Sequence, residues 1–412
     1  MDGAKRYENT LVAILFFTWG TVFLDRMSQH SLAPYFIPEF HLSPHQIGQL
    51  GSVVAVAWAI STLFFGALSD RVGRKRILVP VVFVFSLLSW ISGTVHSFQQ
   101  LLLVRGLLGF AEGPAWSIMT ALIEESSPPS RRGRNIGMVV SAAALVGLAV
   151  APVLTTQVAA RFGWRWAFFV SGVPGFLLAA LIWKLVKEPE GKNVPGAHGH
   201  EVRIRDFFSV LRHRNMWLSC LGSVGFLTWM FLDNIYAPLY ITEVAHQTPT
   251  TMGFLMGASG LGSFFLALFF PTLSDRIGRK PVLLLMAVLC AVVPLALLVT
   301  PLYSYPWILA AIIALTNAGQ GIGALIMVLV PTESVPPQFA ATAIGLATLS
   351  AEILGATVAP ILAGNVAESY GLGVTLWMSA GGAAVVFLAA LLLRETYMVK
   401  AKHSVLQESP AD

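Results

Sequence analysis

The sequence predicts an all-α polytopic membrane protein in which twelve transmembrane helices form two six-helix bundles. The chain of 412 residues is 56% hydrophobic and only 11% charged, whereas a soluble globular protein has about a quarter of its residues charged. Twelve apolar stretches approach or reach the roughly 20 residues that cross a bilayer as a helix. The second half also repeats features of the first. Helices are expected because backbone groups inside a membrane must be satisfied within each segment.

The expected spans alternate with short polar loops. The first follows the segment Met1–Asn9, which is short and mixed in charge and does not resemble a cleaved signal. The second and eighth follow Ser-Pro and Thr-Pro, and each ends at a basic loop. We expect the spans near residues 10–30, 47–68, 77–95, 99–122, 135–158, 166–187, 216–238, 251–272, 281–300, 306–328, 340–364 and 373–394.

The basic residues predict the orientation. Twelve spans place both termini on one side, and 22 of the 26 lysines and arginines fall on that side. Only Arg161 and Arg165 lie in loops on the opposite side, and Arg26 and Arg105 lie within spans. By the positive-inside rule the termini are expected in the cytoplasm, with the protein in the inner (plasma) membrane. The basic loops then contact anionic lipid, and we expect no nucleic-acid partner.

An internal repeat and a polar central segment predict the domain organisation. Ser-Asp-Arg-Val-Gly-Arg-Lys at residues 69–75 returns as Ser-Asp-Arg-Ile-Gly-Arg-Lys at residues 274–280. Two related halves with a binding site between them are a common transporter plan. We expect an N-terminal bundle over residues 1–187, a cytoplasmic linker over 188–214, a C-terminal bundle over 215–395 and a cytoplasmic tail over 396–412.

Four charged residues interrupt the apolar spans of the first half. Asp25 and Arg26 lie on the first span, and Arg105 and Glu112 lie on the fourth. Residues seven apart share a helical face, so Arg105 and Glu112 can line one surface. Adjacent residues point about 100° apart, so one of Asp25 and Arg26 can meet a neighbouring helix while the other faces a cavity. Intramembrane charges are costly and usually mark a substrate or proton path. The alternative is a static ion-pair network, because the formal charges of the four sum to zero.

Each of these charges has an expected role. Arg26 is the first choice for binding a carboxylate through two parallel hydrogen bonds, and Arg105 is expected to hold Asp25 or Glu112 and to contribute to the substrate site. Glu112 is the first choice for a proton carrier, with Asp25 as a second. Burial and a nearby arginine act oppositely on the proton affinity of a carboxyl group. Alternating access changes both, so a proton can load on one side and leave on the other.

Several polar residues have two possible interpretations. Glu352, in the middle of span 11, is a second proton site or a substrate contact. Asn317 and Gln320 have (i, i+3) spacing and either orient a substrate or join helices by hydrogen bonds. Asp233 lies either in the pocket or in the outer headgroup region. His30 is expected to be solvated at the outer mouth, with a role in a proton relay as the alternative.

The repeated basic loops are expected to gate the transporter. In both halves an aspartate and its arginines can pair with one another or with helix termini, and thereby latch the cytoplasmic ends of helices. The alternative is that these charges serve only topology. The predicted gating residues are Asp70, Arg71, Arg74, Asp275, Arg276 and Arg279.

These features resemble those of the major facilitator superfamily. The loop signature Gly-x-x-x-Asp-Arg-x-Gly-Arg-Lys appears as Gly66 to Lys75, and its second copy ends at Lys280. The resemblance implies the major facilitator fold and a monomer.

A narrower resemblance is to the anion:cation symporter family. It rests on Phe23-Leu-Asp-Arg26, on Arg105-Gly-Leu-Leu-Gly-Phe-Ala-Glu-Gly113 and on Gly163-Trp-Arg-Trp-Ala-Phe168. The resemblance implies that Arg26 contacts a substrate carboxylate and that Asp25 and Glu112 couple protons. Phe23 stands in the substrate site where members often have tyrosine, which removes one expected hydrogen bond.

Other functional classes lack their motifs. The sequence has no Gly-x-x-x-x-Gly-Lys-[ST], no Gly-x-Ser-x-Gly and no His-Glu-x-x-His, so we expect neither ATP drive nor an enzyme. Cys220 and Cys290 have no metal-ligand spacing, and we expect no cofactor and no metal. We therefore expect a secondary active transporter that imports a small organic anion (a sugar acid, hydroxy acid or aromatic acid) with protons. A proton-driven exporter of drugs or amphiphiles and a non-transporting metabolite sensor are the alternatives.

Overall fold

A computed structural model describes residues 2–188, 210–336 and 339–397. In these ranges eleven helical segments are long and apolar enough to cross a membrane. The helix α2 (Pro44–Val72), with 29 residues, packs along α4 and completes a set of twelve. The predicted linker lies largely outside the described residues, as does most of the predicted tail.

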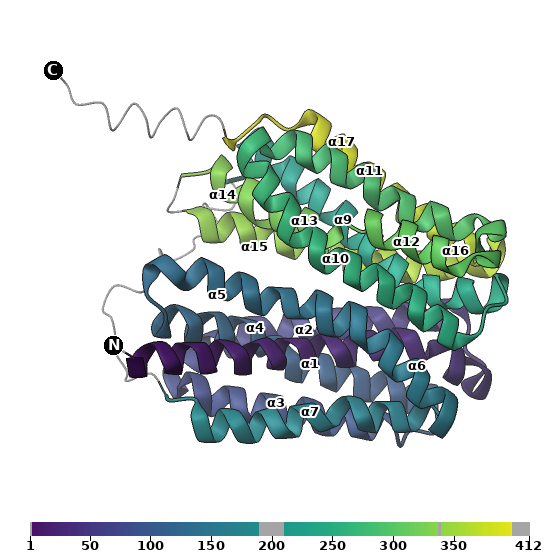
Figure 1. The fold of residues 1–412 in the computed structure, drawn as a ribbon, viewed down its shortest axis with the longest axis horizontal. Coiled ribbons are helices and arrows are strands. Elements are labelled where there is room, and N and C mark those ends of the chain that lie inside the picture. Colours follow the sequence, from purple (N-terminus) through teal and green to yellow (C-terminus); the bar gives the residue numbers. More distant parts are fainter. Residues whose placement is uncertain (1, 189–209, 337–338, 398–412) are drawn as a thin grey trace.

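The helices of the first half pack on one another and form the lower group in Figure 1. The fifth span passes through a π-helical stretch, η1. The elements are α1 (Asp2–Phe40), α2, α3 (Arg74–Ser92), α4 (Phe98–Ser126), α5 (Pro129–Ala142), η1 (Ala143–Val150), α6 (Ala151–Phe162) and α7 (Trp164–Leu185).

The second half forms the upper group in Figure 1, and three of its spans contain π-helical stretches. The elements are α9 (Arg214–Leu239), η2 (Tyr240–Val244), α10 (Pro249–Ile277), α11 (Arg279–Leu298), the 3₁₀ turn η3 (Thr300–Ser304), α12 (Pro306–Thr316), α13 (Gly319–Gly323), η4 (Ala324–Leu329), α14 (Val330–Ser334), α15 (Ala340–Ser350), η6 (Ala351–Val358), α16 (Ala359–Tyr370) and α17 (Gly373–Leu392).

The sequence repeat is also a repeat of backbone conformation. His41 and His246, which precede α2 and α10, both have left-handed φ angles of 51° and 54°. In the loops after these helices, Gly73 and Gly278 have φ angles of 115° and 102°, where a side chain would be strained. Helix starts are equivalent as well, since the Ser43 hydroxyl accepts a hydrogen bond from the Gln46 amide and the Thr248 hydroxyl accepts one from Thr251.

Acidic side chains cap the same helix in both halves. Glu188 accepts hydrogen bonds from the first amides of α3, at Lys75 and Arg76. Glu395 accepts them from the first amides of α11, at Arg279 and Lys280. A carboxylate at a helix N-terminus satisfies free amides and complements the helix dipole. These caps fix the basic loops to the end of each half.

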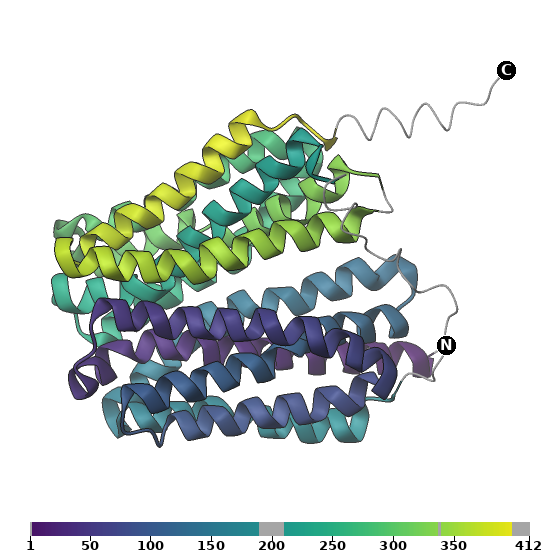
Figure 2. The same cartoon turned by 180° about the vertical axis from the view of Figure 1, so that it is seen from behind.

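The halves meet at the end opposite the termini, which we term the far side. There α10 packs against η1 and α6, and α16 packs against α2 (Figures 1 and 2). The helices of the two halves approach closely there because glycines lie at the contact. A Cβ atom on any of five glycines would overlap atoms of the other half. We term these residues the far-side seam: Gly48, Gly253, Gly257, Gly260 and Gly364.

The end that carries the termini is more open. There α5 and α15 diverge from one another (Figure 1). A Cβ atom added to Gly133 or Gly137 on α5, or to Gly345 on α15, would meet no heavy atom within 4 Å. The two halves are therefore packed closely on the far side, and α5 and α15 lie apart at the end that carries the termini.

The span boundaries and one span interior differ from the prediction. The helix α1 runs from Asp2 to Phe40 rather than over residues 10–30, because apolar length reports the hydrocarbon thickness while a helix continues into the headgroup region. The tenth span is not continuous over residues 306–328. It breaks at Asn317, which has a ψ angle of 82°, because the Asn317 side chain accepts the Gly319 amide in place of a backbone carbonyl.

Candidate functional site

The first charged pair of the site joins α1 to α4. The Arg105 Nη1 atom donates to the Asp25 Oδ2 atom at 2.7 Å, and neither residue is exposed. Ser89 of α3 donates a hydrogen bond to the other carboxylate oxygen of Asp25. The Arg105 guanidinium also lies 4.4 Å from the centroid of the Phe168 ring on α7. One buried ion pair thus ties together four helices of the first half.

The second charged pair is looser. The Arg26 Nε atom lies 3.4 Å from the Glu112 Oε2 atom, and neither carboxylate oxygen of Glu112 has a hydrogen-bond partner among the described residues. Glu112 is fully buried, whereas the Arg26 side chain is 12% exposed. The Arg26 guanidinium lies 5.9 Å from the Phe23 ring centroid and 5.6 Å from that of Trp58. Arg26 is therefore the accessible guanidinium of the cluster.

A third acid reaches this cluster from the second half. Glu352 lies on η6, which packs against α2, and it is within electrostatic range of Arg26. Arg26 thus has one acid of each half, Glu112 and Glu352, within electrostatic range. This arrangement places the group at the interface between the halves, where alternating access changes the contacts.

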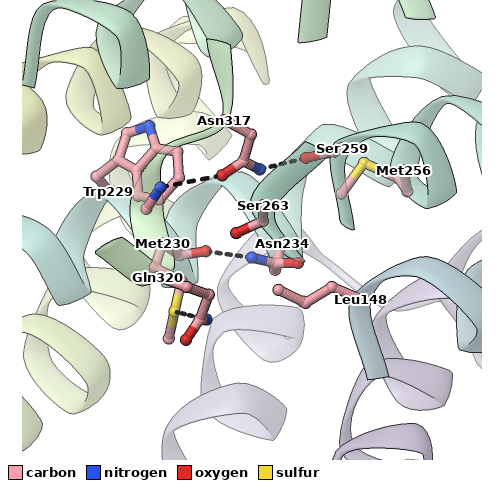
Figure 3. Close-up of a pocket in the computed structure, with 10 residues that line it drawn as sticks. Leu148, Trp229, Met230, Asn234, Met256, Ser259, Ser263, Asn317 and Gln320 are labelled. Carbon is pink, nitrogen blue, oxygen red and sulfur yellow. Dashed lines mark hydrogen bonds between the residues drawn. The ribbon is translucent and has the colours of Figure 1, made fainter. Parts of the chain in front are cut away.

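A small polar cavity lies at the break in the tenth span (Figure 3). Asn317 donates a hydrogen bond to Ser259 of α10 and accepts one from the Gly319 amide, while Gln320 points toward Met230. The cavity measures about 10 Å³, about the least volume that holds one water molecule. Asn317 therefore joins helices here, and this cavity is too small for an organic anion.

Three of the predicted gating residues, Arg74, Asp275 and Arg279, form polar contacts with side chains of their own half. In the second half Arg279 donates to Asp275 at 2.6 Å and to Glu333 at 2.8 Å, and Arg276 is exposed. In the first half Arg74 donates to Ser69 at 2.8 Å and lies 3.4 Å from Glu125. The side chains of Asp70 and Arg71 lie outside the described residues.

One predicted position differs from the structure, and another stays a prediction. Arg105 is fully buried and its guanidinium contacts Asp25 and Phe168, while its Nε and Nη2 atoms have no hydrogen-bond partner among the described residues. Its contribution to the substrate site stays a prediction. His30 was expected to be solvated, but it is only 8% exposed, because α1 continues ten residues beyond it and α2 covers that face. Asp233 was open to two interpretations, and it is buried within the second half.

Sequence reasoning missed two partners of the charged cluster. Ser89 is one of several serines on α3, and only the tertiary structure brings it to Asp25. Trp58 was not among the predicted site residues, yet its ring lies beside Arg26 and its buried Nε1 atom lacks a hydrogen-bond partner in the described part of the chain. The available signal was that both residues carry a polar group within an otherwise apolar span. The described residues contain no cluster of three or more His, Cys, Asp or Glu side chains able to hold a metal ion.

Known proteins resemble this chain over most of its length. Residues 15–356 and 234–411 match the pattern of the Major Facilitator Superfamily. A probable 4-methylmuconolactone transporter of Cupriavidus pinatubonensis is 31% identical over 69% of this chain and 67% of its own length. The cis,cis-muconate transport protein of Acinetobacter baylyi is 30% identical over 81% of this chain and 82% of its own.

A solved structure supports the fold. The crystal structure of a bacterial homologue of the human lysosomal transporter Spinster superposes with a TM-score of 0.73 and 19% identity, covering 98% of this chain and 99% of that one. The predicted fold class and the superfamily resemblance are thus confirmed. The chain belongs to the Major Facilitator Superfamily and is a transporter rather than an enzyme.

Proposed function

We propose that this transporter imports a small organic carboxylate together with protons, by alternating access of its two halves. The observation that carries the proposal is the unequal pairing of the two intramembrane arginines. Arg105 is buried against Asp25 at 2.7 Å, whereas Arg26 is partly exposed and has Glu112 at 3.4 Å without a hydrogen bond. A partly exposed guanidinium attracts a carboxylate and can bind it through two parallel hydrogen bonds.

Charge balance supplies the reason for proton coupling. The Asp25–Arg105 pair is neutral, so Arg26, Glu112 and Glu352 decide the charge of the site. With both acids ionised the site is negative and repels an anion. Protonation of Glu112 removes its attraction for Arg26 and leaves the guanidinium to the substrate. The proton and the anion are therefore expected to bind together and to leave together.

The surroundings of Arg26 favour an anion with an apolar or unsaturated body. Phe23 and Trp58 place aromatic rings within 6 Å of the guanidinium, and an anion bound there lies against these rings. Two relatives are named for the transport of muconate and of a methylmuconolactone, which are compact and unsaturated. Muconate and aromatic acids are accordingly our first candidates, followed by sugar acids and hydroxy acids.

The orientation is part of the proposal. The excess of Lys and Arg on the terminus side supports cytoplasmic termini in the inner membrane. In that orientation, the wider separation of α5 and α15 at the terminus side supports assigning the structure to the state that releases substrate to the cytoplasm. A monomer is also part of the proposal.

The test is uptake of labelled carboxylates into proteoliposomes with and without an inward proton gradient. The panel comprises cis,cis-muconate, benzoate, galactonate and lactate. Arg26→Ala is expected to lower affinity about tenfold to a hundredfold, since a hydrogen bond to a charged group contributes about 1.5–3 kcal/mol. Arg161→Ala, which removes an arginine from an exposed far-side position, is the matched control.

Glu112→Gln separates binding from coupling. This variant is expected to exchange substrate across the membrane in both directions but not to accumulate it when a pH gradient is applied. Glu243→Gln, on an exposed part of η2, is its control. Intact accumulation by Glu112→Gln would refute the coupling role. Intact transport of bulky substrates by Arg26→Ala would instead indicate an exporter of amphiphiles.

A further inference from the structure

Asp233 is a buried acid that the charged cluster does not use. It lies on α9 in the second half and is 2% exposed. Its Oδ1 atom has no hydrogen-bond partner, and none of the ion pairs formed by the described residues includes it. An isolated ionised carboxylate is very costly in such surroundings. Asp233 therefore needs a proton or a cation whenever it is enclosed.

The titratable groups that face Asp233 do not supply a positive charge. Cys290 of α11 and Tyr303 of η3 lie within electrostatic range of it. The Tyr303 hydroxyl donates to the Leu297 carbonyl at 2.9 Å, so its proton is already used in a hydrogen bond and is not donated to Asp233. Tyr240 of η2 lies beside Tyr303, and Glu352 of η6 faces Arg26 instead. A proton on Asp233 is the simplest way to neutralise it.

The break in the tenth span lies next to this acid. Trp229 precedes Asp233 by one turn and donates through Nε1 to the Cys290 carbonyl at 2.9 Å. The Cys290 thiol in turn contacts the Ala318 backbone, at the break itself. An interrupted transmembrane helix offers polar backbone groups that a continuous helix does not, and such breaks often hold coupling ions.

The small polar cavity at the break lies beside the turn of α9 that carries this acid. Trp229, Met230 and Asn234 line it, and they flank Asp233 at the i−4, i−3 and i+1 positions. Opposite them Ser263 presents a buried hydroxyl without a hydrogen-bond partner among the described residues (Figure 3). The cavity has room for about one water molecule. Leu148 of the first half also lines this cavity, whereas Asp233 itself does not, so a water there would lie at the interface between the halves and beside neighbours of the acid.

We propose that Asp233 is a second proton-carrying site, located in the second half and loaded through the polar cavity at the helix break. The carboxylate accepts a proton from a hydronium ion, which leaves as water, and it returns that proton to water after the halves rearrange. This site is separate from Glu112, which lies in the first half. The inference rests on the proposed function, because a second proton matters only to a coupled transporter.

The first test counts protons per substrate in proteoliposomes, with cis,cis-muconate as the probe. Each proton lost from the cycle lowers the limiting accumulation about tenfold for a pH difference of one unit. Asp233→Asn keeps the shape of the neutral acid, and we expect it to move one proton fewer than wild type and to accumulate about tenfold less. Glu243→Gln, on the same span but exposed, is expected to match wild type. An unchanged proton ratio in folded Asp233→Asn would overturn the proposal.

The second test needs no substrate and therefore separates this inference from the proposed function. Infrared difference spectra between low and high pH report the carbonyl stretch of protonated carboxyl groups. We expect a band in wild type and in Glu243→Gln that is missing in Asp233→Asn. If Asp233→Asn retains every band, the acid does not titrate and the proposal fails. If uptake requires sodium and Asp233→Asn loses that requirement, the site binds sodium and the proton assignment fails.

Discussion

A single methyl group in the far-side seam should shift the transporter toward its opposite state. Gly260 of α10 faces the backbone of Leu148 and Ala149 in the other half, and a Cβ atom at Gly260 would overlap both. The obstructing atoms belong to the backbone, so no change of rotamer relieves the overlap. The substitution therefore penalises the state in which the far side is closed and spares the state in which it is open.

The magnitude follows from the cost of overpacking. Inserting a methylene-sized group into a packed core costs about 1–3 kcal/mol. If this cost applies to one state only, the equilibrium between the states shifts about 5-fold to 150-fold. In Gly260→Ala the population of the state with the terminus side closed should thus rise relative to the other state by this factor. The control is Gly381→Ala on α17, where an added Cβ atom would meet no heavy atom within 4 Å.

The assay is the distance between spin labels at Gly133 on α5 and Gly345 on α15, both of which face open space. We expect this distance to shorten in Gly260→Ala and to stay unchanged in Gly381→Ala. An unchanged distance distribution in Gly260→Ala would refute the assignment of the seam as the contact that breaks during the cycle.

Three further predictions concern stability, each measured by unfolding of the detergent-solubilised protein. Ser89→Ala removes a hydrogen bond to the buried Asp25 carboxylate and should lower the free energy of unfolding by about 1.5–3 kcal/mol. The Ser92 hydroxyl donates to the Leu88 carbonyl of its own helix, so Ser92→Ala should cost less. Equal losses of stability would contradict the special role of Ser89. Glu333→Gln breaks an ion pair with Arg279 in which both side chains are 7% exposed, and it should lower the free energy of unfolding by about 3–5 kcal/mol. Glu125→Gln breaks the ion pair with Arg74, in which Glu125 is 38% exposed, and it should cost no more than about 1 kcal/mol. The reverse order would show that burial does not set the strength of these ion pairs. Ser43→Ala removes the side-chain cap of α2 and should cost about 0.5–2 kcal/mol, which Ser43→Asp should restore if capping is the cause.

The architecture could be predicted from local features of the sequence. Apolar length identifies spans because lipid imposes a fixed thickness, and repeated motifs such as those ending at Lys75 and Lys280 reveal two related halves. Helix ends beyond the hydrocarbon layer were missed, as was the break at Asn317, because polar residues at a helix end or break follow no apolar pattern. The superfamily could also be recognised, since its loop signature is contiguous in the chain.

The charged residues themselves were also visible in the sequence, because ionisable groups stand out within apolar spans. Their pairing was not. Arg105 could have held Asp25 or Glu112, and only the packing of α1, α3 and α4 assigns it to Asp25 and leaves Arg26 beside Glu112. Likewise, the position of Asp233 along its span did not decide whether it faces lipid headgroups or a protein interior. The sequence by itself determined which residues carry charge and on which spans they lie, since ionisable residues interrupt contiguous apolar stretches. The tertiary structure alone decided which charges are satisfied, because that depends on neighbours that are distant in the chain.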